Sequence, residues 1–144
     1  MARLRIDFPD LTLFRHQLPV RISDLNYGNH LGHDTLLSLL HEARAWFFRS
    51  FGCEEWDCDG CAMIIADLAV SYRAEAHFGQ SLEVEIGAGP VSPSSCELLY
   101  RVSDRDRGTV VALAATNVVF MDREVRRVVR LPASFVAAVR VEAQ

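Results

Sequence analysis

The chain has 144 residues, of which 50% are hydrophobic and 24% are charged, and its formal net charge is −4. This composition is typical of a globular domain that can bury a core, and it excludes a disordered chain. The negative charge argues against nucleic acid as a partner, and no apolar run is long enough to span a membrane. We therefore expect one domain over residues 1–144 that binds neither nucleic acid nor a membrane.

The N-terminal segment and the cysteines indicate the compartment. Residues 1–14 carry charges and a proline where a signal peptide needs an uninterrupted apolar stretch, so we expect a cytoplasmic protein. In the cytoplasm, the four cysteines would be reduced thiols. Cys58 and Cys61 have zinc-knuckle spacing, but no second Cys-x-x-Cys or His-x-x-x-His follows. We therefore expect no metal site.

The first half of the chain predicts a strand followed by one long helix. Apolar residues alternate with polar ones from Phe14 to Ile22, which is typical of a strand. Leucines and phenylalanines then recur at helical spacing from about His33 to Phe51, and Gly52 is a natural stop. Because this helix is apolar nearly all round, it must be enclosed by the rest of the fold.

The second half predicts consecutive strands. Every even position from Ala62 to Phe78 is apolar, which predicts a long strand with one face in the core. Shorter strands are expected at 82–86, 96–102, 110–121 and within 124–130, with a break or bulge at 87–95 and a hairpin turn at 104–108. Pro132 can open a short C-terminal helix whose inner side carries Phe135, Val136 and Val139.

This order of elements predicts an α+β fold. One helix cannot cover both faces of a five- or six-stranded sheet, so the expected solution is a curved antiparallel sheet wrapped around the helix. The strand at 110–121 is apolar on both faces, which suggests that a second subunit supplies part of its cover.

The link between the first strand and the helix gathers polar side chains. Asp24, Asn26, Asn29 and His30 lie in a turn-rich segment that feeds directly into the buried helix. The start of a helix offers unpaired N–H groups and partial positive charge, which suit an anion or a polarised carbonyl. The link is therefore a candidate site for acyl chemistry.

The same residues resemble a known family. Val20-Arg21, Asp24, His30-Leu31 and Glu42-Ala43-Arg44 match, without gaps, the signature of hotdog-fold acyl-CoA thioesterases of the 4-hydroxybenzoyl-CoA thioesterase-like family. The segments 72–79 and 115–122 are similar to two of that family's strands. The resemblance implies a hotdog fold and hydrolysis of an acyl- or aroyl-CoA to the free acid and CoA, with no cofactor apart from the CoA of the substrate.

The sequence departs from the family at the position of its usual catalytic aspartate, where Asn26 stands. An amide can act neither as a general base nor as an acyl acceptor. Three alternatives follow: Asp24 is the carboxylate; His30 activates a water while Asn26 orients the water or the carbonyl; or a helix acid, Glu42 or Asp34, serves instead. We favour Asn26 and His30, with Asp24 or Glu42 nearby.

The resemblance also suggests how the substrate binds. The backbone of the glycine-rich link would donate hydrogen bonds to the oxyanion, and Arg73 and the arginines around the 104–108 turn are candidates for the CoA phosphates. The acyl tail would run beneath Ile64, Ala66 and Leu68. The expected substrate-binding residues are Tyr27, Gly28, Asn29, Gly32 and Arg73.

The assembly and two rival functions stay open at this point. We expect a homodimer or homotetramer with the site between subunits. The rivals are a hotdog protein that binds acyl thioesters without hydrolysing them, and a dehydratase of 3-hydroxyacyl thioesters.

Overall fold

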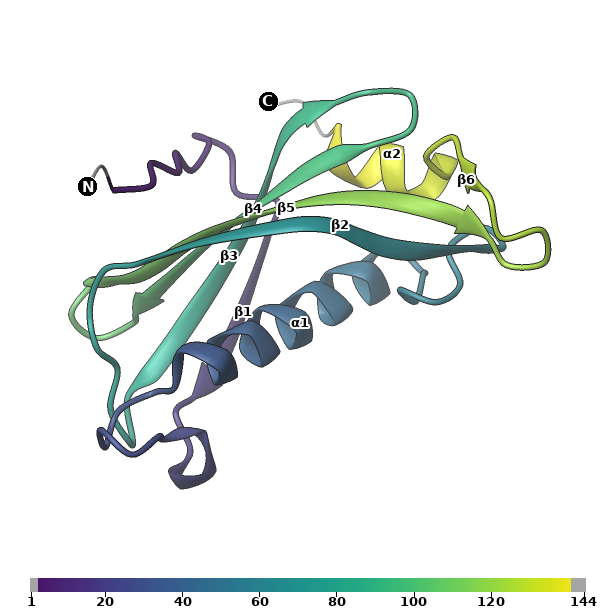
Figure 1. The fold of residues 1–144 in the computed structure, drawn as a ribbon. Helices are drawn as coiled ribbons and strands as arrows, with labels where there is room; N and C mark the ends of the chain where they lie inside the picture. The colour runs from purple at the N-terminus through teal and green to yellow at the C-terminus, as the bar shows by residue number, and fades with distance from the viewer. Residues whose placement is uncertain (1–2, 141–144) are drawn as a thin grey trace.

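A computed structural model describes residues 3–140. Its sheet is antiparallel, with the strand order β1-β3-β4-β5-β2, and β6 pairs with the far end of β5 (Figure 1). In chain order the elements are β1 (Phe14–Pro19), the 3-10 turn η1 (Ile22–Asp24), α1 (His33–Ser50), β2 (Cys61–Tyr72), β3 (Ser81–Val91), β4 (Cys96–Asp104), β5 (Val110–Asp122), β6 (Val128–Val129) and α2 (Ala133–Val139).

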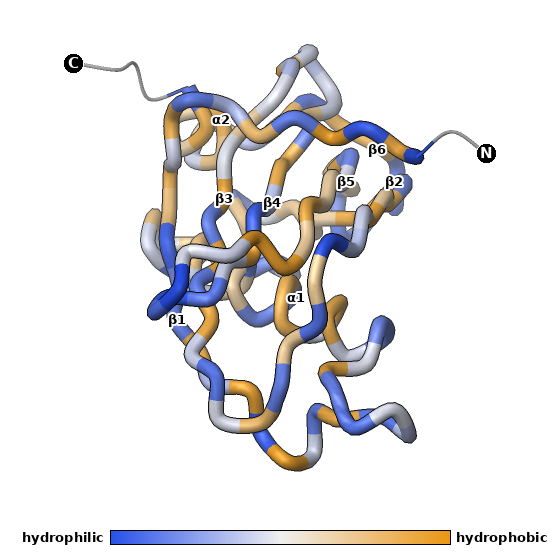
Figure 2. The backbone as a smooth tube through the Cα atoms, turned by 90° about the vertical axis from the view of Figure 1, so that its left-hand side faces the viewer, coloured by the Kyte–Doolittle hydropathy of each residue, from blue (hydrophilic) through white to orange (hydrophobic). Residues whose placement is uncertain are grey.

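The sheet curves over α1, as predicted. Seen end-on, it arches from β1 through β3, β4 and β5 to β2, and α1 lies beneath the arch (Figure 2). The helix buries Leu36, Leu40, Ala43 and Phe47 almost completely. These side chains recur at helical spacing, and their removal from water supplies the main driving force for the wrapped arrangement.

Aromatic side chains close one end of the core. Phe48 of α1, Phe120 of β5 and Phe135 of α2 pack together, with ring centroids 5.0 to 6.2 Å apart. Each of the three is fully buried. The predicted C-terminal helix is confirmed, because α2 begins after Pro132 and buries Phe135 and Val139.

The first strand is shorter at its C-terminal end than the alternation from Phe14 to Ile22 predicts. β1 stops at Pro19, and Ile22 lies in the turn η1 with 67% of its surface exposed. The alternation fails here because the carboxylate of Asp24 accepts a hydrogen bond from the backbone N–H of Arg21 and fixes a tight turn.

The prediction for the long strand is wrong in two respects. β2 ends at Tyr72, and a β-bulge between Ile65 and Asp67 reverses which parity faces the helix. Before the bulge the core-facing side chains are Met63 and Ile65, whereas Ile64 points outward. Ile64 and Leu68 therefore lie on opposite faces of the sheet, and the acyl path predicted beneath both of them is corrected below.

Of the break or bulge expected after the next strand, the structure has the bulge. β3 continues through residues 87–91, with an irregular register between Ala88 and Val91. At Gly87, glycine is needed for close approach rather than for a turn. A Cβ atom on Gly87 would lie 2.6 Å from the Pro9 ring, and one on Gly89 would lie 2.6 Å from the Glu97 carboxylate.

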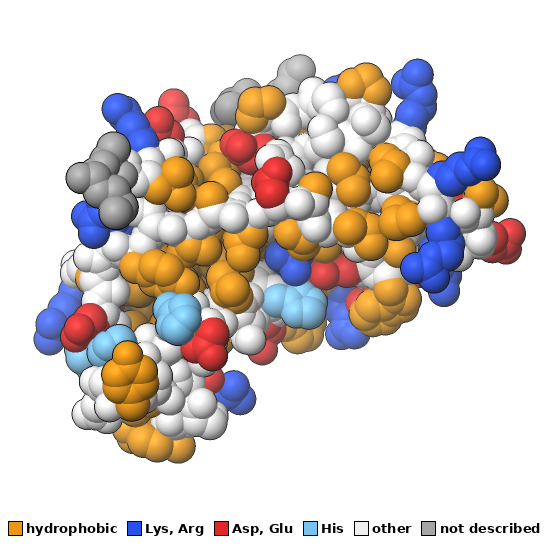
Figure 3. All heavy atoms as spheres, viewed as in Figure 1, with side chains coloured by type: hydrophobic (Ala, Val, Ile, Leu, Met, Phe, Trp, Pro, Cys, Tyr) orange, Lys and Arg blue, Asp and Glu red, His pale blue; other side chains and the backbone are white. Residues whose placement is uncertain are grey.

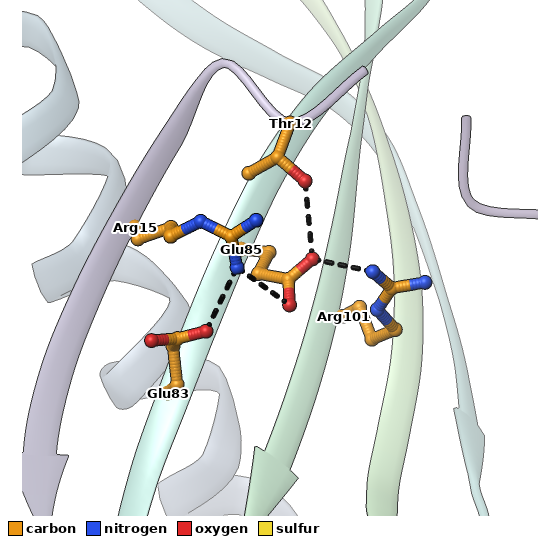
Figure 4. A network of polar contacts seen from close by, with 5 residues as sticks. All are labelled: Thr12, Arg15, Glu83, Glu85 and Arg101. Atoms are coloured by element: carbon orange, nitrogen blue, oxygen red, sulfur yellow. Dashed lines mark hydrogen bonds and ion pairs between the residues drawn. The ribbon is translucent and has the colours of Figure 1, made fainter. Parts of the chain in front are cut away.

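Charged side chains cover the outer face of β1, β3 and β4. Glu85 is only 7% exposed and accepts hydrogen bonds from Thr12 and Arg101, while Arg15 joins it to Glu83 (Figure 4). Because every charge in this network has an opposite partner, its burial is tolerated. The network also anchors the segment that precedes β1.

No helix within residues 3–140 has the length and apolarity needed to cross a membrane.

Candidate active site

A hollow of about 430 Å³ lies where the link before α1 meets the chain just beyond β2. Its lining includes Asn26 and His30, the two favoured residues of the link, and Arg73, which is predicted to bind the CoA phosphates. The lining residues are Asn26, Tyr27, His30, Leu31, His33, Tyr72, Arg73, Ala74 and Glu75.

Backbone hydrogen bonds fix the link that carries the candidate residues. Asn26 N–H donates to the His30 carbonyl at 2.9 Å, and Leu31 N–H donates to the Ala76 carbonyl at 2.8 Å. Asn29 adopts a left-handed conformation with φ of 61°, which asparagine tolerates better than most residues. The link is thus a closed turn tied to the segment after β2, and its side chains have defined directions.

The side chain of Asn26 is oriented by a turn of its own. Its Oδ1 atom accepts a hydrogen bond from the Gly28 N–H at 2.9 Å. Since a backbone N–H can only donate, the oxygen must face Gly28, and the side-chain NH2 group is left to donate elsewhere. Asn26 therefore offers a hydrogen-bond donor to the hollow.

The ring of His30 is fixed in a complementary way. Its Nδ1 atom lies 3.1 Å from the Leu31 carbonyl, which can only accept, so Nδ1 carries the proton in the neutral ring. Nε2 then has a free lone pair. That nitrogen lies 3.8 Å from a carboxylate oxygen of Glu75. A Cβ atom on Gly28 would lie 2.9 Å from Nε2, so glycine is needed for the ring to occupy this place.

Tyr72 connects the end of β2 to the start of α1. Its hydroxyl donates to the His33 carbonyl at 2.7 Å. Burial raises the pKa of the Tyr72 hydroxyl, and the Asp34 carboxylate raises it further, so the group stays protonated as a donor. The helix cap residue, Gly32, supplies no side-chain cap. The first N–H groups of α1 are therefore not covered by a capping side chain beside the hollow.

Asp24 lies outside the hollow and is held by Arg21. It is 2% exposed and accepts hydrogen bonds from the backbone N–H, Nε and Nη2 of Arg21 at 2.8 to 3.3 Å. Burial alone would raise the pKa of this carboxyl, but the hydrogen bonds from Arg21 outweigh it and lower the pKa. Asp24 thus caps the turn and pairs with Arg21, and it is not among the residues that line the hollow.

Glu42 lies on the opposite side of α1 from the hollow. Its carboxylate is 2.9 Å from Nε2 of His16 in β1, and β1 and β2 are at opposite ends of the sheet. The neighbouring residue, His41, faces the β2 side and lies 3.4 Å from Glu55. Glu42 therefore pairs with His16 and is not among the residues that line the hollow.

The remaining predicted residues fall in two groups. Tyr27 and Arg73 line the hollow directly. Gly28, Asn29 and Gly32 shape the link that surrounds it, and a Cβ atom on Gly32 would lie 2.7 Å from the Asp34 carboxylate. Their roles in binding stay predictions.

Sequence reasoning missed Glu75, Tyr72 and His33 as lining residues. Glu75 lies just beyond a strand that was predicted to continue, so it read as one of several solvent-facing polar residues. The available signal was the chain's return to the link, where Ala76 accepts a hydrogen bond from Leu31. That contact depends on tertiary structure and leaves no periodic trace in the sequence.

Within residues 3–140, no three His, Cys, Asp or Glu side chains are grouped so that they could hold a metal ion.

Comparison with known proteins identifies the family. The family model of the thioesterase-like superfamily matches residues 20–139. The chain belongs to this superfamily. The resemblance predicted from the link and the helix is therefore confirmed, and the fold is a hotdog fold. No curated protein matches the sequence significantly.

Solved structures share this hotdog fold along most of their length. The PA2801 protein of Pseudomonas aeruginosa is 21% identical, with a TM-score of 0.83 over 90% of this chain and 99% of its own. Slr0204 of Synechocystis, a 1,4-dihydroxy-2-naphthoyl-CoA thioesterase, is 20% identical, with a TM-score of 0.77 over 88% and 94%. SAV2348 of Staphylococcus aureus, solved in complex with CoA, is 17% identical, with a TM-score of 0.79 over 88% and 80%.

Proposed function

We propose that this protein hydrolyses an acyl- or aroyl-CoA thioester to the free acid and CoA, with Asn26 and His30 at the reacting carbonyl. One observation carries the proposal: Asn26 and His30 line the same hollow at the start of α1, and the oxygen of one and Nδ1 of the other are held by the backbone, which leaves an amide donor and an imidazole lone pair for a ligand. Membership of the thioesterase-like superfamily supports the reaction class.

In the proposed reaction, His30 Nε2 takes a proton from a water molecule as that water attacks the thioester carbon. The negative charge that develops on the carbonyl oxygen is stabilised by the Asn26 NH2 group and by N–H groups at the start of α1. The tetrahedral intermediate then expels CoA as a thiolate, which is protonated by the imidazolium or by solvent. Glu75 lies close enough to Nε2 to offset the charge of the imidazolium.

The acyl group would occupy an apolar strip between α1 and β2. Leu68 and Tyr72 lie on the helix-facing side of β2 after the bulge, yet they are 45% and 42% exposed, and Leu37 of α1 is 36% exposed. Hydrophobic side chains gather along this boundary between the sheet and α1 (Figure 3). The strip replaces the path first predicted beneath Ile64, Ala66 and Leu68.

The CoA part would leave the hollow at the protein surface. Arg73 lines the hollow and carries the charge that a phosphate needs. The CoA complex of the similar Staphylococcus protein supports a ligand of this kind.

We further propose that two copies associate through β2. This strand ends the sheet, and between Met63, which is bonded to Glu55, and Tyr72 its outer edge pairs with no other strand of residues 3–140. The side chain of Ile64 beside this edge is exposed. If the same edge of a second copy pairs with it by two-fold symmetry, the backbone N–H and C=O groups of both edges gain hydrogen-bond partners. The hollow at the end of β2 would then lie near the subunit boundary.

The test is release of free CoA thiol from a panel of acyl- and aroyl-CoAs by wild type, His30→Ala and Glu42→Gln. We expect turnover by wild type and by Glu42→Gln, with at least a hundred-fold loss of kcat, on the order of a general base's contribution, in His30→Ala. Equal activity in wild type and His30→Ala would remove His30 from the mechanism. Binding without thiol release would favour a non-hydrolytic protein, and an enoyl product without thiol would indicate a dehydratase.

A further inference from the structure

A chain of polar side chains runs from the surface of α1 into the centre of the core. His41 Nε2 lies 3.4 Å from Glu55, whose carboxylate accepts a hydrogen bond from Arg44 Nε at 3.2 Å. Arg44 Nη1 donates to the Tyr100 hydroxyl, which lies 2.8 Å from the Thr116 hydroxyl. Arg44, Tyr100 and Thr116 are 8%, 0% and 2% exposed.

The Arg44 side chain carries a full charge in this position. Burial opposes that charge, but Tyr100 and Glu55 outweigh it and keep the pKa of the guanidinium above its ordinary value. A buried ion pair of this kind adds little stability compared with apolar side chains of the same size, because both charges must leave water. Its place in the fold therefore calls for a role beyond holding the core together.

The polar chain lies at the inner end of the apolar strip. Leu68 pairs directly with Thr116 across β2 and β5, so the network begins beside the strip. On the helix, His33, Leu37 and His41 follow one another at intervals of four residues and thus lie along one face. The first of them lines the hollow, and the last lines a second hollow with Glu55 and Met63.

The spacing along this face sets a length. Eight residues separate His33 from His41, which corresponds to about 12 Å of helix at about 1.5 Å per residue. An extended acyl chain gains about 1.3 Å per carbon, given C–C bonds of about 1.5 Å. A chain whose carbonyl lies beside His30 would therefore reach Glu55 and Arg44 after roughly eight to ten carbons.

We propose that the Arg44–Glu55 pair closes the acyl strip and limits the substrates to acyl groups of about eight to ten carbons. This inference rests on the proposed thioesterase function. Up to the pair, each added methylene is buried against Leu37, Leu68 and Tyr72. Beyond it, a methylene would have to displace a hydrogen-bonded charge or stay in water, and it gains nothing.

The test is the dependence of kcat/KM on acyl length in a saturated series from four to sixteen carbons, below the concentrations at which long acyl-CoAs form micelles. In wild type we expect kcat/KM to rise about four-fold per methylene, the equivalent of about 0.8 kcal/mol, and to level or fall beyond roughly eight to ten carbons. In the double variant Arg44→Met/Glu55→Met, the rise should continue by two or more carbons. Arg15→Met/Glu83→Met, which removes an ion pair on the outer face of the sheet, is the matched control and should keep the wild-type limit.

The outcomes separate the inference from the proposed function. Turnover without a limit, or with the same limit in the Arg44→Met/Glu55→Met variant, would overturn the inference and leave hydrolysis standing. If no acyl-CoA is hydrolysed, the proposed function fails, and the same series is followed by equilibrium binding. A chain-length limit in affinity that moves only in Arg44→Met/Glu55→Met would then still support the closing role of the pair. If affinity shows no such limit, the inference is overturned. A general loss of folding is separated by thermal melting, since a purely structural role changes Tm without moving the chain-length limit.

Discussion

Replacement of Asn26 by aspartate distinguishes two ways in which this site could work. The resemblance of the link to the family signature implies a catalytic carboxylate at this position. In this structure, Asn26 is a donor, because its Oδ1 atom is occupied by the Gly28 N–H. Asn26→Asp keeps the acceptor that shapes the turn and removes the NH2 group. The substitution therefore leaves the link intact and takes away the proposed oxyanion donor.

The size of the effect follows from the role of that donor. Removal of one oxyanion donor typically lowers kcat by about 10²- to 10³-fold, equivalent to about 2.7 to 4 kcal/mol. A carboxylate also places negative charge where the oxyanion forms, so Asn26→Asp should lose at least as much as Asn26→Ala. The loss of stability should have the reverse order, with Asn26→Ala less stable than Asn26→Asp. Asn26→Ala loses the turn hydrogen bond, at about 1 kcal/mol, whereas Asn26→Asp retains it.

The assay is thiol release under single-turnover conditions with the best acyl-CoA of the panel, together with thermal melts of both variants. The expected result is that Asn26→Asp melts like wild type and is at least a hundred-fold slower. An Asn26→Asp variant that is as fast as wild type, or faster, would refute the donor role. It would show instead that the link is built for a carboxylate.

Three further predictions concern the structure that holds the site. Asp24→Asn should lower the free energy of unfolding by roughly 2 kcal/mol at pH 7, because charge-assisted hydrogen bonds from Arg21 are lost. Since the pKa of Asp24 is lowered from its ordinary value of 3.8 in the folded protein, its contribution is complete above that value and is lost as pH falls through the folded pKa. In urea titrations, the free energy of unfolding should therefore fall less between pH 7 and a pH below 3 for the variant than for wild type. If wild type stays more stable than the variant by the same amount below pH 3 as at pH 7, this reasoning is contradicted. Phe135→Ala should cost about 3 to 5 kcal/mol, because three phenylalanine rings lose their contact; a cost under 1 kcal/mol in calorimetry would mean that α2 does not close the core. Ile64→Glu should convert the proposed dimer to a monomer in sedimentation equilibrium with its Tm nearly unchanged, since this side chain is 40% exposed in one protomer, and a mass equal to wild type would place the interface elsewhere.

The sequence predicts the architecture well where one periodicity dominates. The leucine and phenylalanine spacing of α1 predicts its start at His33, and the alternation in β4 predicts that strand to within two residues. The nearly continuous apolar run of β5 predicts its bounds to within one residue. It predicts poorly where two patterns compete. Residues 62–66 are apolar on both parities, so nothing in the sequence locates the extra residue of the bulge at Ile65/Asp67.

In the site, residues close together in the sequence could be predicted, whereas contacts set by tertiary packing could not. Asn26 and His30 could be predicted because they lie in one short link at a helix start. Asp24 pairs with Arg21, which is only three residues away, so this contact also forms within the link. Glu75 could not be found, because its approach to His30 depends on where β2 ends and how the chain returns. The partner of Glu42 is also set by tertiary packing, which brings His16 of β1 against α1.

The most direct test of a thioesterase site at the start of α1 is the rate of CoA thiol release by purified wild type and His30→Ala, measured side by side on the same acyl-CoAs. We predict turnover by the wild-type protein and a loss of at least a hundred-fold in the variant, with both proteins melting at similar temperatures. Undiminished thiol release by His30→Ala, or none by a folded wild-type protein with any acyl-CoA, would contradict it.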